Sequence, residues 1–198
     1  FLFFSNLKPL EGFMFHHIGA LNKDRNPYTL WKVLGELCKE NPEFKKDLII
    51  KFTGKTDAIA FDDLKKNGIL DNVQKTDYLP HSEVVKLMTQ SPILLLALNN
   101  TPNNAGVLSG KLFEYLAAKR PIFGIGPPNA DAAAILNETK AGSMIHFDDF
   151  EGMKTQVLNL YNKYKNNTLV VTSAAIDKFS RKSCAEAFAN LLNEITVK

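Results

Sequence analysis

The residues best suited to chemistry lie in the stretch Asn99–Pro121, where a loop rich in Asn, Pro and Gly leads into a helix that begins at Ser109 and Gly110. The free backbone N–H groups and the positive end of a helix attract anions, and Lys111 adds a full positive charge in the first turn. Ser109 is the type of residue that caps a helix N-terminus. This stretch therefore predicts a site for a diphosphate.

Glu114 follows Lys111 by three residues, so the two side chains are expected to be neighbours at the mouth of this helix. Its carboxylate could accept hydrogen bonds from a ribose diol. The alternative is an exposed Lys–Glu pair worth roughly a few tenths of a kcal/mol. At 100° per residue, an apolar face and a face away from it are expected. The apolar face comprises Leu112, Phe113, Leu116 and Ala117, and the other comprises Lys111, Glu114, Tyr115 and Ala118.

A second basic residue follows the first predicted strand, in the loop Gly19–Arg25. Gly19 would let a ligand approach the backbone, and the guanidinium of Arg25 can bind two phosphate oxygens as a fork. A solvated surface arginine beside a turn is the alternative that the residues leave open.

Other patterns do not predict a site. Gly124–Asn129 superficially resembles a dinucleotide fingerprint, but Asn129 replaces the third glycine and two prolines remove N–H groups that a pyrophosphate needs. None of the four histidines has a ligand spacing, and adjacent His16 and His17 should point to opposite faces of a strand. Core or surface histidines are expected, with no metal and no cofactor.

The elements that position these residues alternate between strands and helices. The predicted strands are Gly12–Ala20, Asp47–Thr53, Asn72–Leu79, Pro92–Leu98, Pro121–Gly126 and Ser143–Phe147. The predicted helices begin at Pro27 with Asn26 as cap, at Pro80 and at Ser109, or span Ala58–Asn67, Ala130–Thr139, Phe150–Lys165 and Ser173–Ile195. This order predicts an α/β fold, a Rossmann-like, doubly wound parallel sheet of about six strands. The most apolar strand, Pro92–Leu98, should be central, and the more polar Asn72–Leu79 should lie nearer an edge.

Composition limits the classes of protein. The 198 residues, 45% hydrophobic and 23% charged, fit one globular domain, and no apolar run approaches the roughly 20 residues of a membrane span. Scattered lysines and a net charge of +3 argue against a nucleic-acid partner. Cys38 and Cys184 suggest reduced thiols and the cytoplasm. Because the chain begins at Phe1 without Met, we expect a fragment, with residues 1–4 covering an edge of the core.

Three segments together resemble the C-terminal half of family 4 glycosyltransferases, which are retaining enzymes of the GT-B architecture. They are Gly19 with Arg25–Pro27, Tyr78–Glu83, and Ser109–Ala117 with Pro121. The resemblance covers nearly the whole chain, and the run SGKLFEYLA is its most specific part.

The resemblance implies a nucleotide-diphosphate sugar as donor. Arg25 and Lys111 would act as catalytic residues that hold its diphosphate, Glu114 would hold the ribose, and the turn at Leu79 and Pro80 would meet the base. The family has a second acid eight residues before the ribose-binding one, where this chain has Gly106. Backbone N–H groups of Ala105–Leu108 could take its place. The expected donor-binding residues are Gly19, Arg25, Leu79, Pro80, Gly106, Val107, Leu108, Ser109, Gly110, Lys111 and Glu114.

Residues 1–198 would thus be the nucleotide-sugar-binding domain, and an N-terminal domain before Phe1 would bind a glycan or lipid-linked acceptor. The last helix would pack back toward that domain, which would leave apolar residues partly exposed in this chain. They are Ile176, Phe179, Phe188, Leu191 and Leu192. The cytoplasm is the expected location, with peripheral association of the full-length protein with the inner membrane face as one option.

Two other functions remain open. One is a sugar-nucleotide epimerase of GT-B architecture, and the other is a non-catalytic nucleotide- or glycan-binding module. A dinucleotide dehydrogenase is least favoured, because no Gly-x-Gly-x-x-Gly follows the first strand.

Overall fold

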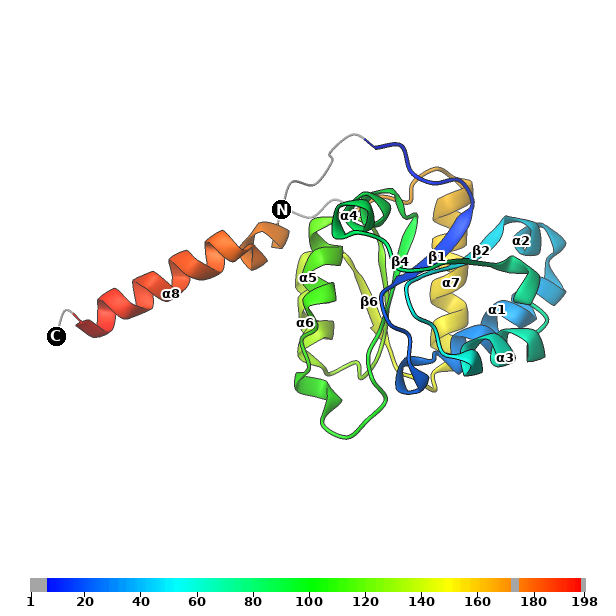
Figure 1. Cartoon of the computed structure of the whole chain (residues 1–198), viewed down its shortest axis with the longest axis horizontal. Helices are drawn as coiled ribbons and strands as arrows, with labels where there is room; N and C mark the ends of the chain where they lie inside the picture. The colour runs from blue at the N-terminus through cyan, green and yellow to red at the C-terminus, as the bar shows by residue number, and fades with distance from the viewer. Residues whose placement is uncertain (1–6, 172–174, 197–198) are drawn as a thin grey trace.

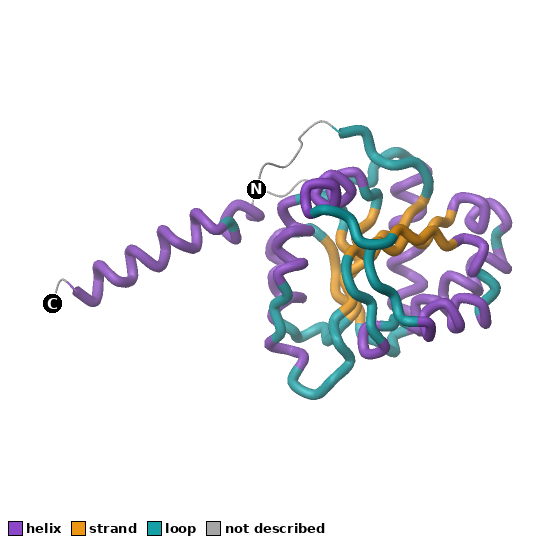
Figure 2. The backbone as a smooth tube through the Cα atoms, viewed as in Figure 1, coloured by secondary structure: helices purple, strands orange, loops and turns teal. Residues whose placement is uncertain are grey.

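The computed structural model describes residues 7–171 and 175–196 and confirms the predicted fold class. All paired strands are parallel and form one six-stranded sheet in the order β3-β2-β1-β4-β5-β6, drawn in orange in Figure 2. The strands are β1 Phe13–Ile18, β2 Leu48–Thr53, β3 Val73–Thr76, β4 Ile93–Ala97, β5 Ile122–Ile125 and β6 Gly142–Ile145.

The position of each strand in the sheet follows its polarity. Every residue of β4 is buried, and β4 lies between β1 and β5 as predicted. β3 has no buried residue and forms one edge, also as predicted. β3 ends at Thr76, three residues earlier than expected, and Asp77 and Tyr78 beyond it are exposed. Charge and exposure therefore limit the length of the edge strand, whereas burial defines the central one.

Helices cover both faces of the sheet. α1, α3 and α7 lie on one side, and α4, α5 and α6 lie on the other (Figure 1). The α-helices are α1 Tyr28–Glu40, α2 Pro42–Asp47, α3 Ala58–Lys66, α4 His81–Gln90, α5 Gly110–Ala117, α6 Asp131–Thr139, α7 Phe150–Lys165 and α8 Arg181–Thr196. Short 3-10 turns are η1 Lys23–Arg25, η2 Leu70–Asn72, η3 Asn104–Gly106 and η4 Ala175–Phe179.

The start of α1 corrects one prediction. Pro27, rather than Asn26, occupies the N-cap position, and no side chain caps this helix. The Asn26 side chain instead accepts a hydrogen bond from the Trp31 indole at 2.8 Å and donates one to Asp63 at 2.7 Å. A buried indole N–H needs an acceptor, and Asn26 is used for that purpose.

α2 was not predicted, and it explains why β2 begins at Leu48 instead of Asp47. The Asn41 side chain accepts hydrogen bonds from the N–H groups of Glu43 and Phe44, and Pro42 occupies the first turn. These are the usual signals of a helix start, on a helix of only six residues.

The C-terminal segment also differs from the single helix expected at Ser173–Ile195, and its first residues, like residues 1–4, lie outside the described part of the chain. Ser180 separates η4 from α8 because its Oγ accepts the N–H of Ser183 at 3.1 Å, as an N-cap does. α8 then projects away from the domain (Figure 1).

The partial exposure predicted for apolar residues of this segment is wrong for Ile176 and correct for the others. Phe188, Leu191 and Leu192 on α8 are exposed, as expected. Ile176 is instead buried, whereas Phe179 is partly exposed, as expected, and packs against Phe113 of α5 with their ring centroids 6.3 Å apart. η4 therefore completes the covering of the domain, and only α8 leaves it.

Candidate functional site

A small cleft lies where β1 and β4 reach the carboxyl edge of the sheet. We call it the β1–β4 cleft. Its lining residues are His17, Arg25, Leu96, Ala97, Leu98, Asn99, Val107, Ser109 and Lys111. It brings together Arg25 and Lys111, two basic residues that lie far apart in the sequence and were both predicted to bind a diphosphate. Ligands of open parallel sheets bind at this edge, where loops and helix N-termini converge.

Lys111 reaches from the first turn of α5 to the end of β1. Its Nζ donates a hydrogen bond to the carbonyl oxygen of Ile18. Burial lowers the pKa of Lys111, the nearby charge of Arg25 lowers it further, and Glu114 opposes this effect. The ammonium is thus partly removed from water, which strengthens its interaction with any anion in the cleft.

Gly19 accommodates this lysine. Its φ of +114° lies in a region that side chains with a Cβ rarely adopt. A Cβ at this position would also collide with Nζ of Lys111. Gly19 therefore touches the site through Lys111, and both its backbone angle and its missing side chain are required.

Tyr115 overturns the expected division of α5 into two faces. Tyr115 is fully buried and Ala118 is buried as well, although the helical spacing assigned both to the face away from the core, and Phe113 and Ala117 of the expected apolar face are only half-buried. Its hydroxyl accepts the N–H of Ile18 at 3.1 Å, and burial raises the pKa of the hydroxyl. Ile18 is therefore bonded to α5 through both of its backbone groups, one to Lys111 and one to Tyr115.

Arg25 is held in place by hydrogen bonds. Its Nε donates to Oδ1 of Asn99 at 2.7 Å, and its Nη1 lies 3.4 Å from the carbonyl oxygen of Ala20. The N–H of Asn100 donates to the carbonyl of Asp24 at 2.7 Å, which joins the same two loops. The guanidinium is therefore positioned at the cleft by the residues that follow β4.

Ser109 occupies the N-cap position of α5, but its side chain does not cap the helix. Its Oγ is buried and has no hydrogen-bond partner among the described residues. Leaving a buried hydroxyl unpaired costs about 1–3 kcal/mol. Because Ser109 lines the β1–β4 cleft, this unpaired hydroxyl lies beside the site.

Among the other predicted site residues, only Val107 lines the cleft. Glu114 is half-buried one turn beyond Lys111. Gly106, Leu108 and Gly110 are exposed in or beside the η3 loop. Leu79 and Pro80 follow β3, which two strands separate from β4. The donor-binding roles of these residues stay predictions.

His17 belongs to the cleft, although its sequence context predicted only a core or surface histidine. It is buried, with Nδ1 3.1 Å from the carbonyl oxygen of Leu95 and Nε2 3.3 Å from that of Ala20. Burial, then the charge of Lys111, lowers its pKa to about 4. The sequence did contain a signal for a site role of His17, because this residue lies near the end of a predicted strand, immediately before Ile18 and Gly19.

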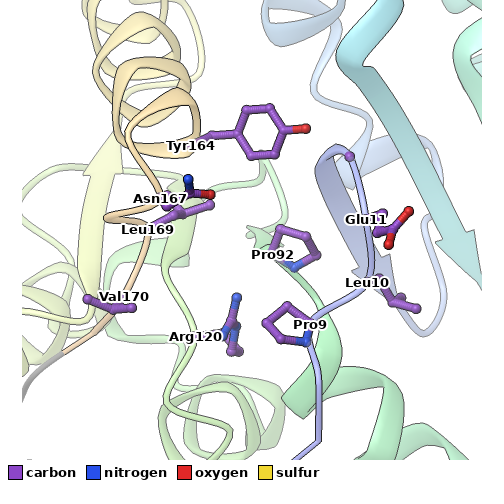
Figure 3. Close-up of a pocket in the computed structure, with 10 residues that line it drawn as sticks. Pro9, Leu10, Glu11, Pro92, Arg120, Tyr164, Asn167, Leu169 and Val170 are labelled. Carbon is purple, nitrogen blue, oxygen red and sulfur yellow. The ribbon is translucent and has the colours of Figure 1, made fainter.

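A larger cavity of about 480 Å³ lies at the opposite edge, beside the residues that precede β1 and β4. Figure 3 shows Tyr164 and Asn167 reaching it from the end of α7, opposite Pro9 and Leu10. Arg120 lies there, and its Nε donates to the carbonyl of Ser91 at 2.8 Å. We place the candidate site at the smaller cleft because the positive groups and the N-terminus of α5 converge there.

The described residues hold neither a metal-ligand cluster nor a membrane-spanning helix. Within 7–171 and 175–196, no three His, Cys, Asp or Glu side chains gather in a way that could hold a metal ion. No helix of that part of the chain is both long and apolar enough to cross a bilayer.

The fold matches domains of solved glycosyltransferases. A mutant of S. aureus TarM, in complex with Fondaparinux, alpha-GlcNAc-glycerol and UDP, matches 94% of this chain with a TM-score of 0.67 and 16% identity. The pneumococcal O-GlcNAc transferase GtfA, in complex with UDP and GlcNAc, matches 96% with a TM-score of 0.64 and 16% identity. Sucrose-phosphate synthase from Thermosynechococcus elongatus matches 94% with a TM-score of 0.66 and 10% identity.

These likenesses define the class of fold. The chain has the Rossmann-like α/β fold of one domain of GT-B glycosyltransferases, and it spans 36%, 37% and 46% of the length of the three structures. The sequence matches no family model and no curated protein.

Proposed function

We propose that this chain is the nucleotide-sugar-binding domain of a retaining GT-B glycosyltransferase, which transfers a sugar from a nucleoside diphosphate to a glycan or glycoconjugate. The observation that carries the proposal is the meeting of Arg25, Lys111 and Ser109 in the β1–β4 cleft at the start of α5. Two cations, an unpaired hydroxyl and a helix N-terminus match the charge and oxygen atoms of a diphosphate.

In this reaction the bond between the sugar and the terminal phosphate oxygen breaks, and the diphosphate leaves with the electron pair. The acceptor hydroxyl forms the new bond to the same carbon and loses its proton. Lys111 and Arg25 would stabilise the charge that develops on the leaving phosphate. Because Lys111 is half-buried and Arg25 is held by Asn99, both are positioned before the reaction begins.

The remaining contacts are extensions of this proposal. Glu114, one turn beyond Lys111 on α5, would accept hydrogen bonds from the ribose, and the backbone near Leu79 and Pro80 would meet the base. Gly106 occupies the position where the family carries an acid, and backbone N–H groups of the η3 loop would replace it. The absent acid also favours a second candidate, a non-catalytic nucleotide-binding module.

The acceptor would be bound by a domain outside this chain. The chain itself spans less than half of the length of the matched structures. A glycan or lipid-linked acceptor, a cytoplasmic location and peripheral membrane association of the full-length protein belong to the same proposal. No metal or cofactor is assigned a step in it.

Calorimetric titration with UDP and GDP tests the site. Lys111→Ala should weaken binding of the preferred nucleotide by about tenfold to a hundredfold, because a charge-assisted hydrogen bond is worth about 1.5–3 kcal/mol. Lys163→Ala, which removes an exposed lysine from α7, should leave the affinity unchanged. Equal affinity of wild type and Lys111→Ala would refute the site, and failure to bind either nucleotide would refute the function.

Activity of the full-length protein separates the alternatives. Transfer of the sugar to an added acceptor indicates a glycosyltransferase, and isomerisation of the free sugar nucleotide indicates an epimerase. Nucleotide binding with neither reaction indicates a non-catalytic module.

A further inference from the structure

Two adjacent buried histidines on β1 have different hydrogen-bond partners. His16 Nδ1 lies 2.7 Å from Oγ of Ser91, and its Nε2 lies 2.9 Å from Oγ1 of Thr53. Ser91 donates its own proton to the carbonyl of Leu87 at 2.6 Å, so it accepts from Nδ1–H of His16. The Thr53 hydroxyl can then donate to Nε2. A neutral ring at His16 therefore has both nitrogens satisfied.

The ring of His17 cannot be satisfied in this way. Its two nitrogens face the carbonyl oxygens of Leu95 and Ala20, which only accept hydrogen bonds. A neutral imidazole carries one N–H, so the lone pair of its other nitrogen points at an oxygen. Only the protonated ring can donate to both carbonyls. The geometry at His17 thus favours a second proton.

The charges around the cleft oppose that proton. Lys111 approaches from α5 and Arg25 from η1, and both raise the cost of a positive ring. His16 is the titratable neighbour on β1, and buried Tyr115 contributes a neutral hydroxyl. Glu114 acts on Lys111 and Tyr115, and the residues of β4 that line the cleft carry no charge.

We propose that His17 is a positioning residue of the β1–β4 cleft and takes up one proton from solvent when a nucleoside diphosphate binds between Lys111 and Arg25. This inference rests on the proposed function. Burial is the largest factor that opposes a positive ring, and the charge of Lys111 is the next. The diphosphate neutralises Lys111 and Arg25, which removes the charge repulsion while the hydrogen bonds to both carbonyls favour the proton. The protonated ring then holds Leu95 in the middle of β4 and Ala20 beyond β1 together.

The shared carbonyl of Ala20 connects this proton to Arg25. The Nη1 of Arg25 lies 3.4 Å from that oxygen, at the long limit of a hydrogen bond. Once Nε2–H of His17 donates to the Ala20 carbonyl, Nη1 can turn to the phosphate while Nε stays on Asn99. No covalent bond changes, and the proton returns to solvent when the nucleotide leaves.

Proton uptake is measured by titrating the 198-residue chain with UDP, and in parallel with GDP, in two buffers of different ionisation enthalpy between pH 6 and 8. The variants are His17→Gln and, as a matched control on the opposite face of the strand, His16→Gln. Protons exchanged by the nucleotide itself are common to all three proteins and cancel in the comparison. Wild type and His16→Gln should take up as much as one proton more than His17→Gln.

The pH dependence of affinity follows from the same linkage. Lowering the pH should tighten nucleotide binding to wild type relative to His17→Gln, by at most tenfold per pH unit. Equal proton uptake in wild type and His17→Gln would overturn this inference and leave the proposed function standing. Binding of neither nucleotide to wild type would overturn both.

A measurement on wild type alone guards against misfolding of the variant. The ring nitrogens of His17 can be observed by NMR in protein labelled with ¹⁵N-histidine. Addition of saturating nucleotide near pH 6 should move both signals to the positions of an imidazolium ring. Signals that keep the neutral pattern with nucleotide bound would refute the proposal without any substitution.

Discussion

The ammonium group of Lys111 lies against Gly19, so close that a Cβ on this glycine would collide with it. The same ammonium donates to the carbonyl of Ile18, the last residue of β1. The start of α5 and the end of β1 are therefore joined through the residue that we propose as a phosphate ligand. Changes on either side of this contact should affect both stability and nucleotide binding.

Gly19→Ala should destabilise the domain by about 1–3 kcal/mol and weaken nucleotide binding, because it adds backbone strain and displaces Lys111. Gly68→Ala is the matched control, since Gly68 also has a positive φ, of +72°, but a Cβ there meets nothing within 4 Å. Urea unfolding and calorimetry measure both effects. A cost no greater than that of Gly68→Ala, with unchanged affinity, would contradict the role of the contact.

Tyr115→Phe should lower the free energy of unfolding by about 1–3 kcal/mol, because the buried N–H of Ile18 loses its acceptor. Tyr78→Phe removes a hydroxyl from a residue that is 86% exposed and should change stability by less than about 0.5 kcal/mol. Both are measured by urea unfolding. Similar values for the two variants would show that the hydroxyl of Tyr115 does not hold β1.

Arg25→Lys should weaken nucleotide binding by about tenfold, because lysine keeps the charge but loses the fork and the Nε bond to Asn99. Arg120→Lys is the control, since Arg120 also donates through Nε, to Ser91, but at the opposite edge of the sheet. Calorimetry compares the two. The proposed role of Arg25 fails if both substitutions leave the affinity at its wild-type value.

Stability should fall as the pH is lowered from 7 toward 4. Burial lowers the pKa of His16 to about 3 and that of His17 to about 4, below the value of about 6.5 in the unfolded chain. Between these values the unfolded state binds more protons, so the free energy of unfolding rises with pH. The slope approaches about 1.4 kcal/mol per pH unit for each histidine.

This pH dependence is measured by urea unfolding of the nucleotide-free protein at several pH values. The double variant His16→Gln/His17→Gln should show a shallower slope than wild type between pH 6.5 and 4. Identical slopes would mean that other groups cause the pH dependence.

Removal of residues 181–198 should leave the stability of the domain within about 0.5 kcal/mol of wild type, because no residue between Arg181 and Thr196 is buried. Ile176→Ala, in contrast, should cost about 2–5 kcal/mol, since Ile176 is only 7% exposed. Urea unfolding of the truncated protein and of Ile176→Ala measures both changes in the free energy of unfolding. Marked destabilisation by the truncation would show that α8 packs on the domain.

Much of the fold follows from local patterns. The apolar run before Asn99 predicted the central strand, because a strand covered on both faces must be apolar throughout. Six strands alternating with helices then left few arrangements other than a parallel, doubly wound sheet. α2 escaped prediction because six residues are too few for a helical period to be recognised.

Helical spacing also failed at Tyr115. A rotation of 100° per residue shows which residues share a face of the helix, but it does not show how much of the helix circumference is buried. The packing of α5 buries Tyr115 and Ala118 together with Leu112 and Leu116 but leaves Phe113 and Ala117 half-buried. The hydroxyl of Tyr115 accepts the backbone N–H of Ile18.

For the candidate site, local sequence patterns were enough to identify the two cations. Arg25 follows the first strand and Lys111 begins a helix, and both positions are recognisable from neighbouring residues. Their meeting in one cleft, beside the unpaired hydroxyl of Ser109, depends on how β1, β4 and α5 pack together. Strand alternation sends His16 and His17 to opposite faces, but the packing of α5 decides which face lines the cleft. The reason is physical: local patterns set the direction of each side chain relative to its own element, whereas contacts depend on the packing of different elements.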